Sequence, residues 1–215
     1  MTLTLLIWLF TISQPTPPGT IRIGDFLVDR SEVSIIAWKE YVQHRSQQLD
    51  SSDIKKIMPD RWFSPWYYGL YPATPDFPVV GITHQQALDY CKWRSEVVSR
   101  SLGKKITYRL PTIAEWQKIA RIASVKQERN IMQEKNAMRN KIAGTSIASG
   151  LAEGMVKGDL ISRLFTNVSE MTSLPGMAMG SSNENIRSLE EDLTTPVAYN
   201  QMGFYIGFRC IAEWD

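Results

Sequence analysis

The regular pattern of hydrophobic and polar positions begins at residue 20. Residues 20–29 (TIRIGDFLVD) alternate on both sides of a Gly-Asp pair, which predicts a strand with a break. Residues 204–212 (FYIGFRCIA) alternate as well, with Phe208 and Cys210 on the same apolar face. This second pattern predicts a central strand near the C-terminus whose inner face includes Cys210.

Three further stretches show helical periodicity, and each follows a residue that can cap a helix. Ser34 precedes the first. Thr83 and Gln86 form a capping box before the second, and Thr112 and Glu115 form another before the third. The predicted helices cover residues 35–45, 84–100 and 113–123.

Long polar stretches separate these elements. Residues 46–61 and the Gly/Ala/Ser-rich residues 143–160 are predicted loops. Loops of this length in a compact domain commonly have a functional role.

Residues 120–141 remain helical in pattern and become basic, with Lys135 among the cations, which predicts a solvated helix face.

One loop is unusually aromatic. Residues 62–71 (WFSPWYYGLY) contain six aromatic side chains, and Pro65 and Gly69 prevent a single helical stripe. We therefore expect some of these side chains to be exposed, where Trp and Tyr act as rigid interface anchors. The alternative is that the loop folds back and covers the sheet. The candidate partner-binding residues are Trp62, Phe63, Trp66, Tyr67, Tyr68 and Tyr71.

Length and charge restrict the function classes. The 215 residues suit one domain, and the net charge of +2 with no Lys/Arg run argues against nucleic-acid binding. The apolar run at the N-terminus is shorter than the about 20 residues that a membrane span needs. We predict a signal peptide over residues 1–13, a Pro-rich linker over 14–19 and one domain over 20–215, with no membrane span after signal removal. The alternative is a buried first element of a cytosolic protein.

Few residues offer recognisable chemistry. The two histidines, His44 and His84, are far apart and match no metal-ligand spacing. The two cysteines, Cys91 and Cys210, favour one disulfide in an exported chain, whereas two buried thiols are expected in the cytosol.

Five segments in order resemble a known family. They are FLVDRSEV (26–33), FPVVGIT with ALDYCKW (77–93), YRLPTIAEW (108–116), TNVSEMT (166–172) and GFRC (207–210). The ordered set resembles the formylglycine-generating enzymes, also called sulfatase-modifying factors. Its Pro-Val-Val-Gly and Cys-Lys-Trp segments are most similar to the gliding-motility and type IX secretion lipoproteins J and K of Bacteroidota.

The resemblance implies a fold and a covalent link. It implies an α+β, elaborated C-type-lectin-like domain with small twisted sheets, about three helices and long loops. It also implies a disulfide between Cys91 and Cys210, since family members join the corresponding positions.

The chain departs from the family at the site of its oxidase chemistry. Active members carry a copper-binding cysteine pair shortly before the final strand, but residues 176–199 contain no cysteine. Met177 and Met179 are weak substitutes, because Cu(I) prefers thiolates. We expect no catalytic residues and no copper.

Calcium is the only candidate cofactor. Asn167, Val168 and Glu170 remain from a family calcium site, and oxygen ligands on a loop suit this ion. The alternative is that Asn167 and Glu170 only satisfy backbone amides in a turn.

These features predict a non-catalytic binding or structural module of the cell envelope. We expect it to be exported to the periplasm or the outer membrane, as a component or accessory of a secretion or gliding-type protein complex. The alternatives are an enzyme of the formylglycine-generating or oxidase type with a non-standard site, and a glycan-binding lectin-like module.

Overall fold

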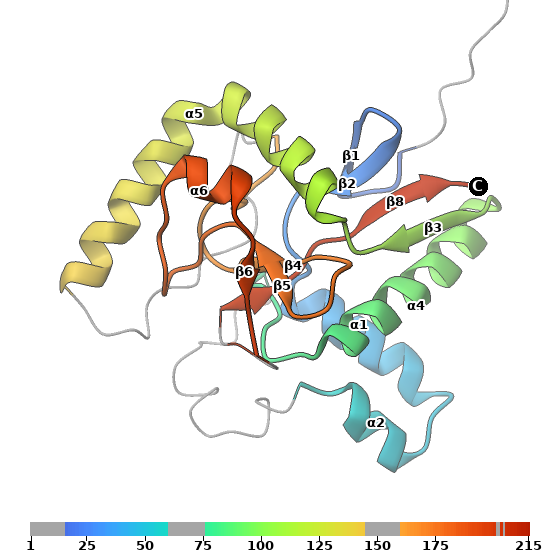
Figure 1. The fold of residues 1–215 in the computed structure, drawn as a ribbon. Helices are drawn as coiled ribbons and strands as arrows, with labels where there is room; N and C mark the ends of the chain where they lie inside the picture. The colour runs from blue at the N-terminus through green and yellow to red at the C-terminus, as the bar shows by residue number, and fades with distance from the viewer. Residues whose placement is uncertain (1–15, 60–75, 145–159, 201–202, 204) are drawn as a thin grey trace, which may run out of the picture.

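The computed structural model describes residues 16–59, 76–144, 160–200, 203 and 205–215, an α+β arrangement of two small sheets and flanking helices (Figure 1). This confirms the predicted fold class. None of the helices within these ranges is long and apolar enough to cross a membrane.

The first sheet contains four antiparallel strands in the order β1-β2-β8-β3. They are β1 (Thr20–Ile23), β2 (Phe26–Asp29), β8 (Ile211–Trp214) and β3 (Ile106–Arg109). The turn between β1 and β2 includes Gly24 at φ 61°, a left-handed conformation that glycine adopts without steric cost. The predicted strand with a break is therefore a β-hairpin.

Helices cover both faces of this sheet. Figure 1 shows α1 (Ile35–Ser46) and α4 (His84–Leu102) on one side and α5 (Ile113–Gly144) on the other. Successive residues of β2 accordingly enter different cores: Leu27 packs in the cluster with α1 and α4, and Val28 in the cluster with α5. Alternation thus buries both faces of the strand.

The predicted helix starts are confirmed. Ser34 accepts a hydrogen bond from the backbone of α1, and the capping boxes at Thr83 and Thr112 form as expected. The third predicted helix and the helical pattern over residues 120–141 form one continuous helix, α5, so the helix does not end at residue 123. Ile131 and Lys135, one turn apart, are both buried and give this extension a packed stripe.

The predicted loop over residues 46–61 was wrong in part, because it contains α2 (Ser51–Ile57). Asp50 caps this short helix through two backbone N–H groups. Its last carbonyl accepts a hydrogen bond from Trp38 Nε1 at 3.2 Å, and Gln86 Nε2 donates to another at 2.7 Å. Tertiary contacts therefore satisfy carbonyl groups at its end.

The second sheet has the order β6-β5-β4-β7, and all of its strands come from the C-terminal half of the chain. Its strands are β4 (Ser169–Met171), β5 (Met177–Met179), β6 (Val197–Ala198) and β7 (Ile206–Gly207). β4 pairs in parallel with β7, and the other pairings are antiparallel.

The single C-terminal strand was predicted incorrectly. Its residues divide between β7 and β8, which belong to different sheets. In between, the Phe208 carbonyl accepts from the backbone of Val33, and the Cys210 N–H donates to Asp29. Phe208 and Cys210 nevertheless lie in the same core, as predicted, while Arg209 between them is fully buried.

Candidate functional site

A buried ion pair joins the two sheets. Arg209 Nε donates to Glu170 Oε2 at 2.7 Å, and its Nη2 donates to Oε1 at 2.5 Å. Trp116 Nε1 also donates to Oε2, at 2.8 Å. Both charged side chains are completely buried, so the pair depends on this geometry to offset the cost of desolvation.

The same guanidinium holds two further segments. Nη1 donates to the carbonyl of Asp29 at the end of β2, and Nη2 donates to the carbonyl of Ser162. Arg209 therefore connects the first sheet, the second sheet and the segment before β4. The alternation pattern gave it no such role, because it assigned this position to the opposite strand face.

Glu32 lies beside this ion pair as a second buried carboxyl group. It is 4% exposed, and its Oε1 accepts a hydrogen bond from Asn167 Nδ2 at 3.0 Å. Its Oε2 has no hydrogen-bond partner among the described residues. Burial raises the pKa of Glu32 to about 7, with Arg209 opposing and Glu170 reinforcing this shift.

The predicted calcium residues do not fit a calcium site in this arrangement. Both oxygens of Glu170 accept from Arg209, and the side-chain amide of Asn167 donates to Glu32. Val168 packs in the core. Calcium needs six or more oxygen ligands, and the described part of the chain contains no cluster of three His, Cys, Asp or Glu residues able to hold a metal ion.

The two cysteines are in contact. Cys91 on α4 and Cys210 before β8 are buried, with their sulfur atoms 3.4 Å apart. A disulfide bond is about 2.05 Å long, so the structure contains two thiols, and the disulfide stays a prediction. Burial raises the pKa of Cys210, which keeps that thiol protonated and unreactive.

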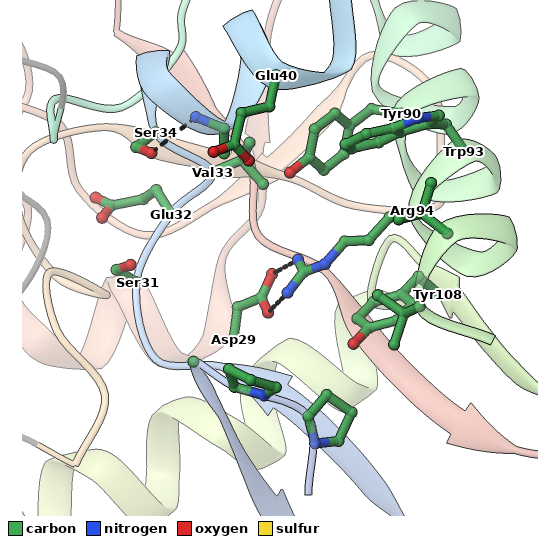
Figure 2. A pocket seen from close by; sticks show the side chains of 16 residues that line it. Asp29, Ser31, Glu32, Val33, Ser34, Glu40, Tyr90, Trp93, Arg94 and Tyr108 are labelled. Atoms are coloured by element: carbon green, nitrogen blue, oxygen red, sulfur yellow. Dashed lines mark hydrogen bonds and ion pairs between the residues drawn. The ribbon is translucent and has the colours of Figure 1, made fainter. Parts of the chain in front are cut away.

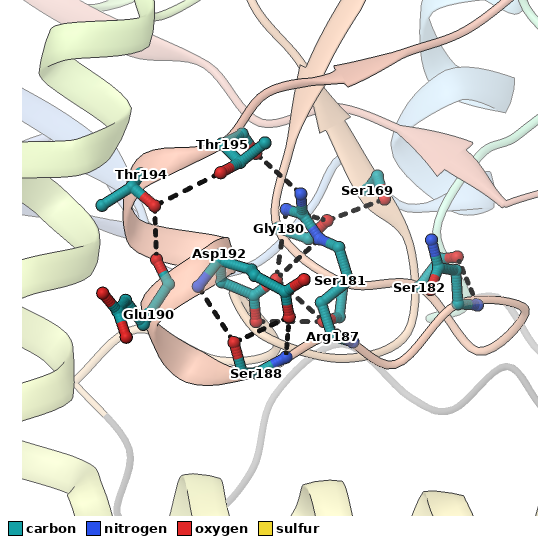
Figure 3. A network of polar contacts seen from close by, with 12 residues as sticks. Ser169, Gly180, Ser181, Ser182, Arg187, Ser188, Glu190, Asp192, Thr194 and Thr195 are labelled. Carbon is teal, nitrogen blue, oxygen red and sulfur yellow. Dashed lines mark hydrogen bonds and ion pairs between the residues drawn. The ribbon is translucent and has the colours of Figure 1, made fainter.

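A second buried polar network joins α5 to α6 (Leu189–Thr194). Lys135 Nζ lies 2.5 Å from Asp192 Oδ2 and 3.0 Å from Ser181 Oγ. Arg187 Nε donates to the other oxygen of Asp192 at 3.2 Å (Figure 3). We call Lys135, Ser181, Arg187 and Asp192 the Lys135 network.

The Lys135 network corrects one prediction. Lys135 was assigned to a solvated face but is 1% exposed, because Asp192 approaches it from the far end of the sequence. A signal for the partner helix was available: Ser188 and Glu191 form a capping box at the start of α6.

The predicted partner-binding aromatics, Trp62, Phe63, Trp66, Tyr67, Tyr68 and Tyr71, lie outside the described residues. Their role therefore stays a prediction from the sequence.

Comparison with known proteins identifies the family. The model of the sulfatase-modifying factor enzyme 1-like domain (FGE-sulfatase) matches residues 8–152, more than half of the chain. The chain belongs to this family. The match includes α1, α4 and the Tyr-Arg-Leu-Pro motif, and it ends before the second sheet.

The chain also resembles solved structures, and the first of the two below supports the fold. The crystal structure of CarF has a TM-score of 0.53 and 15% sequence identity, covering 88% of this chain and 87% of CarF. PvdO from Pseudomonas aeruginosa has a TM-score of 0.46 and 16% identity, covering 87% and 80% respectively. At such identities only the fold is comparable. No curated protein sequence matches the chain.

Proposed function

We propose that this member of the family is a non-catalytic binding or structural module of the cell envelope. It acts as a component or accessory of a secretion or gliding-type protein complex. The observation that carries the proposal is the composition and packing of residues 176–199, the segment in which active family members place their copper-binding cysteines.

That segment lacks the thiols, and several of its polar side chains pair with one another. It contains no cysteine, and the side chains of Ser181, Arg187 and Asp192 form hydrogen bonds within the Lys135 network. Met179 is fully buried in the core beside α5, so its thioether is not presented to a ligand. Oxidase chemistry that depends on soft thiolate ligands has no support here.

The thiols of Cys91 and Cys210 lie in a different place. They pack in the core between the first sheet and α4, among Tyr90 and Phe208. A buried pair surrounded by apolar side chains suits a structural role better than access to a peptide substrate.

Binding is assigned to the aromatic segment at residues 62–71. Its density of Trp and Tyr is typical of interface hot spots, and Trp62, Trp66 and Tyr67 would lead the contact. An envelope protein is the proposed partner because of the predicted signal peptide and the resemblance to gliding and secretion lipoproteins.

A peptide-oxidation assay tests the absence of catalysis. Purified protein is loaded with Cu(I) and incubated with oxygen and a sulfatase-type cysteine peptide, beside an active family enzyme as the positive control. We expect no formylglycine product and no oxygen consumption above the metal blank. Product formation by this chain at a rate near that of the control would refute the proposal.

Partner capture tests the binding role. Trp66→Ala and Tyr67→Ala are compared with wild type for folding and for cross-linking to envelope proteins in native membranes. Leu174→Ala is the control, because Leu174 is a 51% exposed apolar side chain that does not belong to residues 62–71. We expect the two aromatic variants, and not the control, to lose at least about 2 kcal/mol of binding. Unchanged capture by both folded variants would exclude this segment as the contact.

A further inference from the structure

A pocket of about 410 Å³ lies between α1, α4 and the segment that enters β1 (Figure 2), and none of the four residues of the Lys135 network lines it. This volume is within the range of small-ligand sites. Apolar side chains form much of its wall, among them Pro17, Pro18, Val97 and Val98.

Two tyrosine hydroxyl groups supply polarity to this pocket. In Figure 2 the Tyr90 hydroxyl is directed toward Val33 and Glu40, and the Tyr108 hydroxyl lies on the other side of the Asp29–Arg94 pair; both residues line the pocket. Tyr108 is only 3% exposed, and its hydroxyl has no hydrogen-bond partner among the described residues. Buried hydroxyl groups in native proteins normally take part in a hydrogen bond, so this one is suited to bind a polar group that enters the pocket.

The aromatic rings themselves are already occupied. Tyr90 stacks on Trp38 at 5.5 Å between ring centroids, and the Arg94 guanidinium lies 4.3 Å from the centroid of Tyr108. The rings therefore offer their hydroxyl edges rather than open faces, which argues against a stacked sugar as the ligand.

The charges that line the pocket sum to a negative value. Arg94 is neutralised by two parallel hydrogen bonds to Asp29, at 2.6 and 2.8 Å. Glu32 directs its carboxyl group to Asn167 in the buried centre. Glu40 on α1 lines the pocket and is exposed, so its carboxylate can form an ion pair with a bound ligand.

We infer that this pocket receives a lysine side chain from a partner polypeptide. The ammonium group would pair with Glu40 and donate to the Tyr90 hydroxyl, while the aliphatic stem packs against the proline and valine wall. The Tyr108 hydroxyl would donate to a carbonyl oxygen of the same ligand. This inference rests on the proposed function, because it supplies a second contact for a protein partner.

Binding of a small lysine derivative tests the inference directly. Nα-acetyl-lysine methylamide is titrated into the full chain and followed by NMR chemical shifts, together with the norleucine and glutamate analogues. The lysine derivative is expected to bind about fivefold more tightly than norleucine, the ratio that an exposed charge pair of about 1 kcal/mol produces. The glutamate derivative is expected to bind least.

Variants then separate the pocket from general charge effects. Glu40→Gln is expected to remove the preference for lysine. Glu96→Gln should leave the preference unchanged, because Glu96 is an exposed carboxylate on α4 that does not line the pocket. Tyr108→Phe should weaken binding severalfold without loss of thermal stability, since the hydroxyl has no hydrogen-bond partner within the described ranges.

Equal affinity for the lysine and norleucine derivatives, no binding of either, or tighter binding of methyl glucoside would overturn the inference. Full partner capture by Glu40→Gln and Tyr108→Phe would overturn it as well and leave the proposed function intact. Failure of the proposed function is recognised by a different readout, the formation of formylglycine.

Discussion

Replacing Glu32 by glutamine should make the protein more stable above neutral pH and leave it almost unchanged in acid. Glu32 is buried, accepts one hydrogen bond from Asn167 and has an oxygen without a partner among the described residues. The protonated carboxyl group and the neutral amide are similar in size, so the substitution mainly removes the ability to ionise. The effect should therefore depend on pH.

The magnitude follows from the pKa of this group. Burial raises the pKa of Glu32 from its ordinary 4.5 to about 7. A shift of this size corresponds to about 3 kcal/mol, since each unit is worth about 1.4 kcal/mol. Because the pKa is raised in the folded state, the contribution of protonated Glu32 to the free energy of unfolding is complete below pH 4.5 and is lost as the pH rises through 7. The free energy of unfolding of the glutamine variant should not fall in this way.

Urea unfolding followed by tryptophan fluorescence measures the difference. The free energy of unfolding is determined for wild type and Glu32→Gln below pH 4.5, near pH 7 and above it. We expect the variant to gain up to about 3 kcal/mol relative to wild type across this range. Glu96→Gln is the matched control, because that carboxyl group is exposed.

Two results would refute this reasoning. A difference between wild type and Glu32→Gln that stays constant with pH would mean that the carboxyl group ionises in the folded state as easily as in water. A variant less stable than wild type above pH 7 would mean that attraction to Arg209 outweighs the cost of burial.

Three further predictions concern buried groups. Cys91 and Cys210 should form a disulfide in protein recovered from an oxidising compartment, so that denatured, unreduced protein shows no titratable thiols. Reduction should then lower the free energy of unfolding by about 4–5 kcal/mol on the chain-entropy model. Glu170→Gln should destabilise the fold by about 3 kcal/mol or more in urea unfolding, because it leaves a buried guanidinium without its carboxylate. Lys135→Met should cost about 1–3 kcal/mol, since Asp192 keeps a second cationic partner, and hydrogen exchange should increase in the C-terminal half of α5 while its first turns stay protected.

Local signals in the sequence were sufficient for several elements. The hairpin of β1 and β2 and the starts of α1, α4 and α5 depend on neighbouring residues, because alternation and capping are interactions over a few positions. The ordered motifs likewise led to the family, which the match over residues 8–152 now shows.

Elements held by distant partners were not predictable in this way. The short helix α2 depends on Trp38 and Gln86, which donate to its final carbonyl groups. The helical pattern of residues 120–141 was visible in the sequence, but the burial of Lys135 on that helix depends on Asp192, which pairs with it. A pattern of single residues cannot indicate that a charge far along the chain will neutralise another.

The sequence by itself determined the family, the fold class, the absence of cysteine from residues 176–199 and the shared apolar face of Phe208 and Cys210. Only the tertiary structure decided that Arg209, between those two, turns inward to pair with Glu170. It also decided that Glu32 lies beside this pair with one carboxyl oxygen that has no partner in the described part of the chain. The reason is physical: periodicity reports which side chains avoid water, whereas the burial of a charge depends on a partner whose position is set by the complete fold.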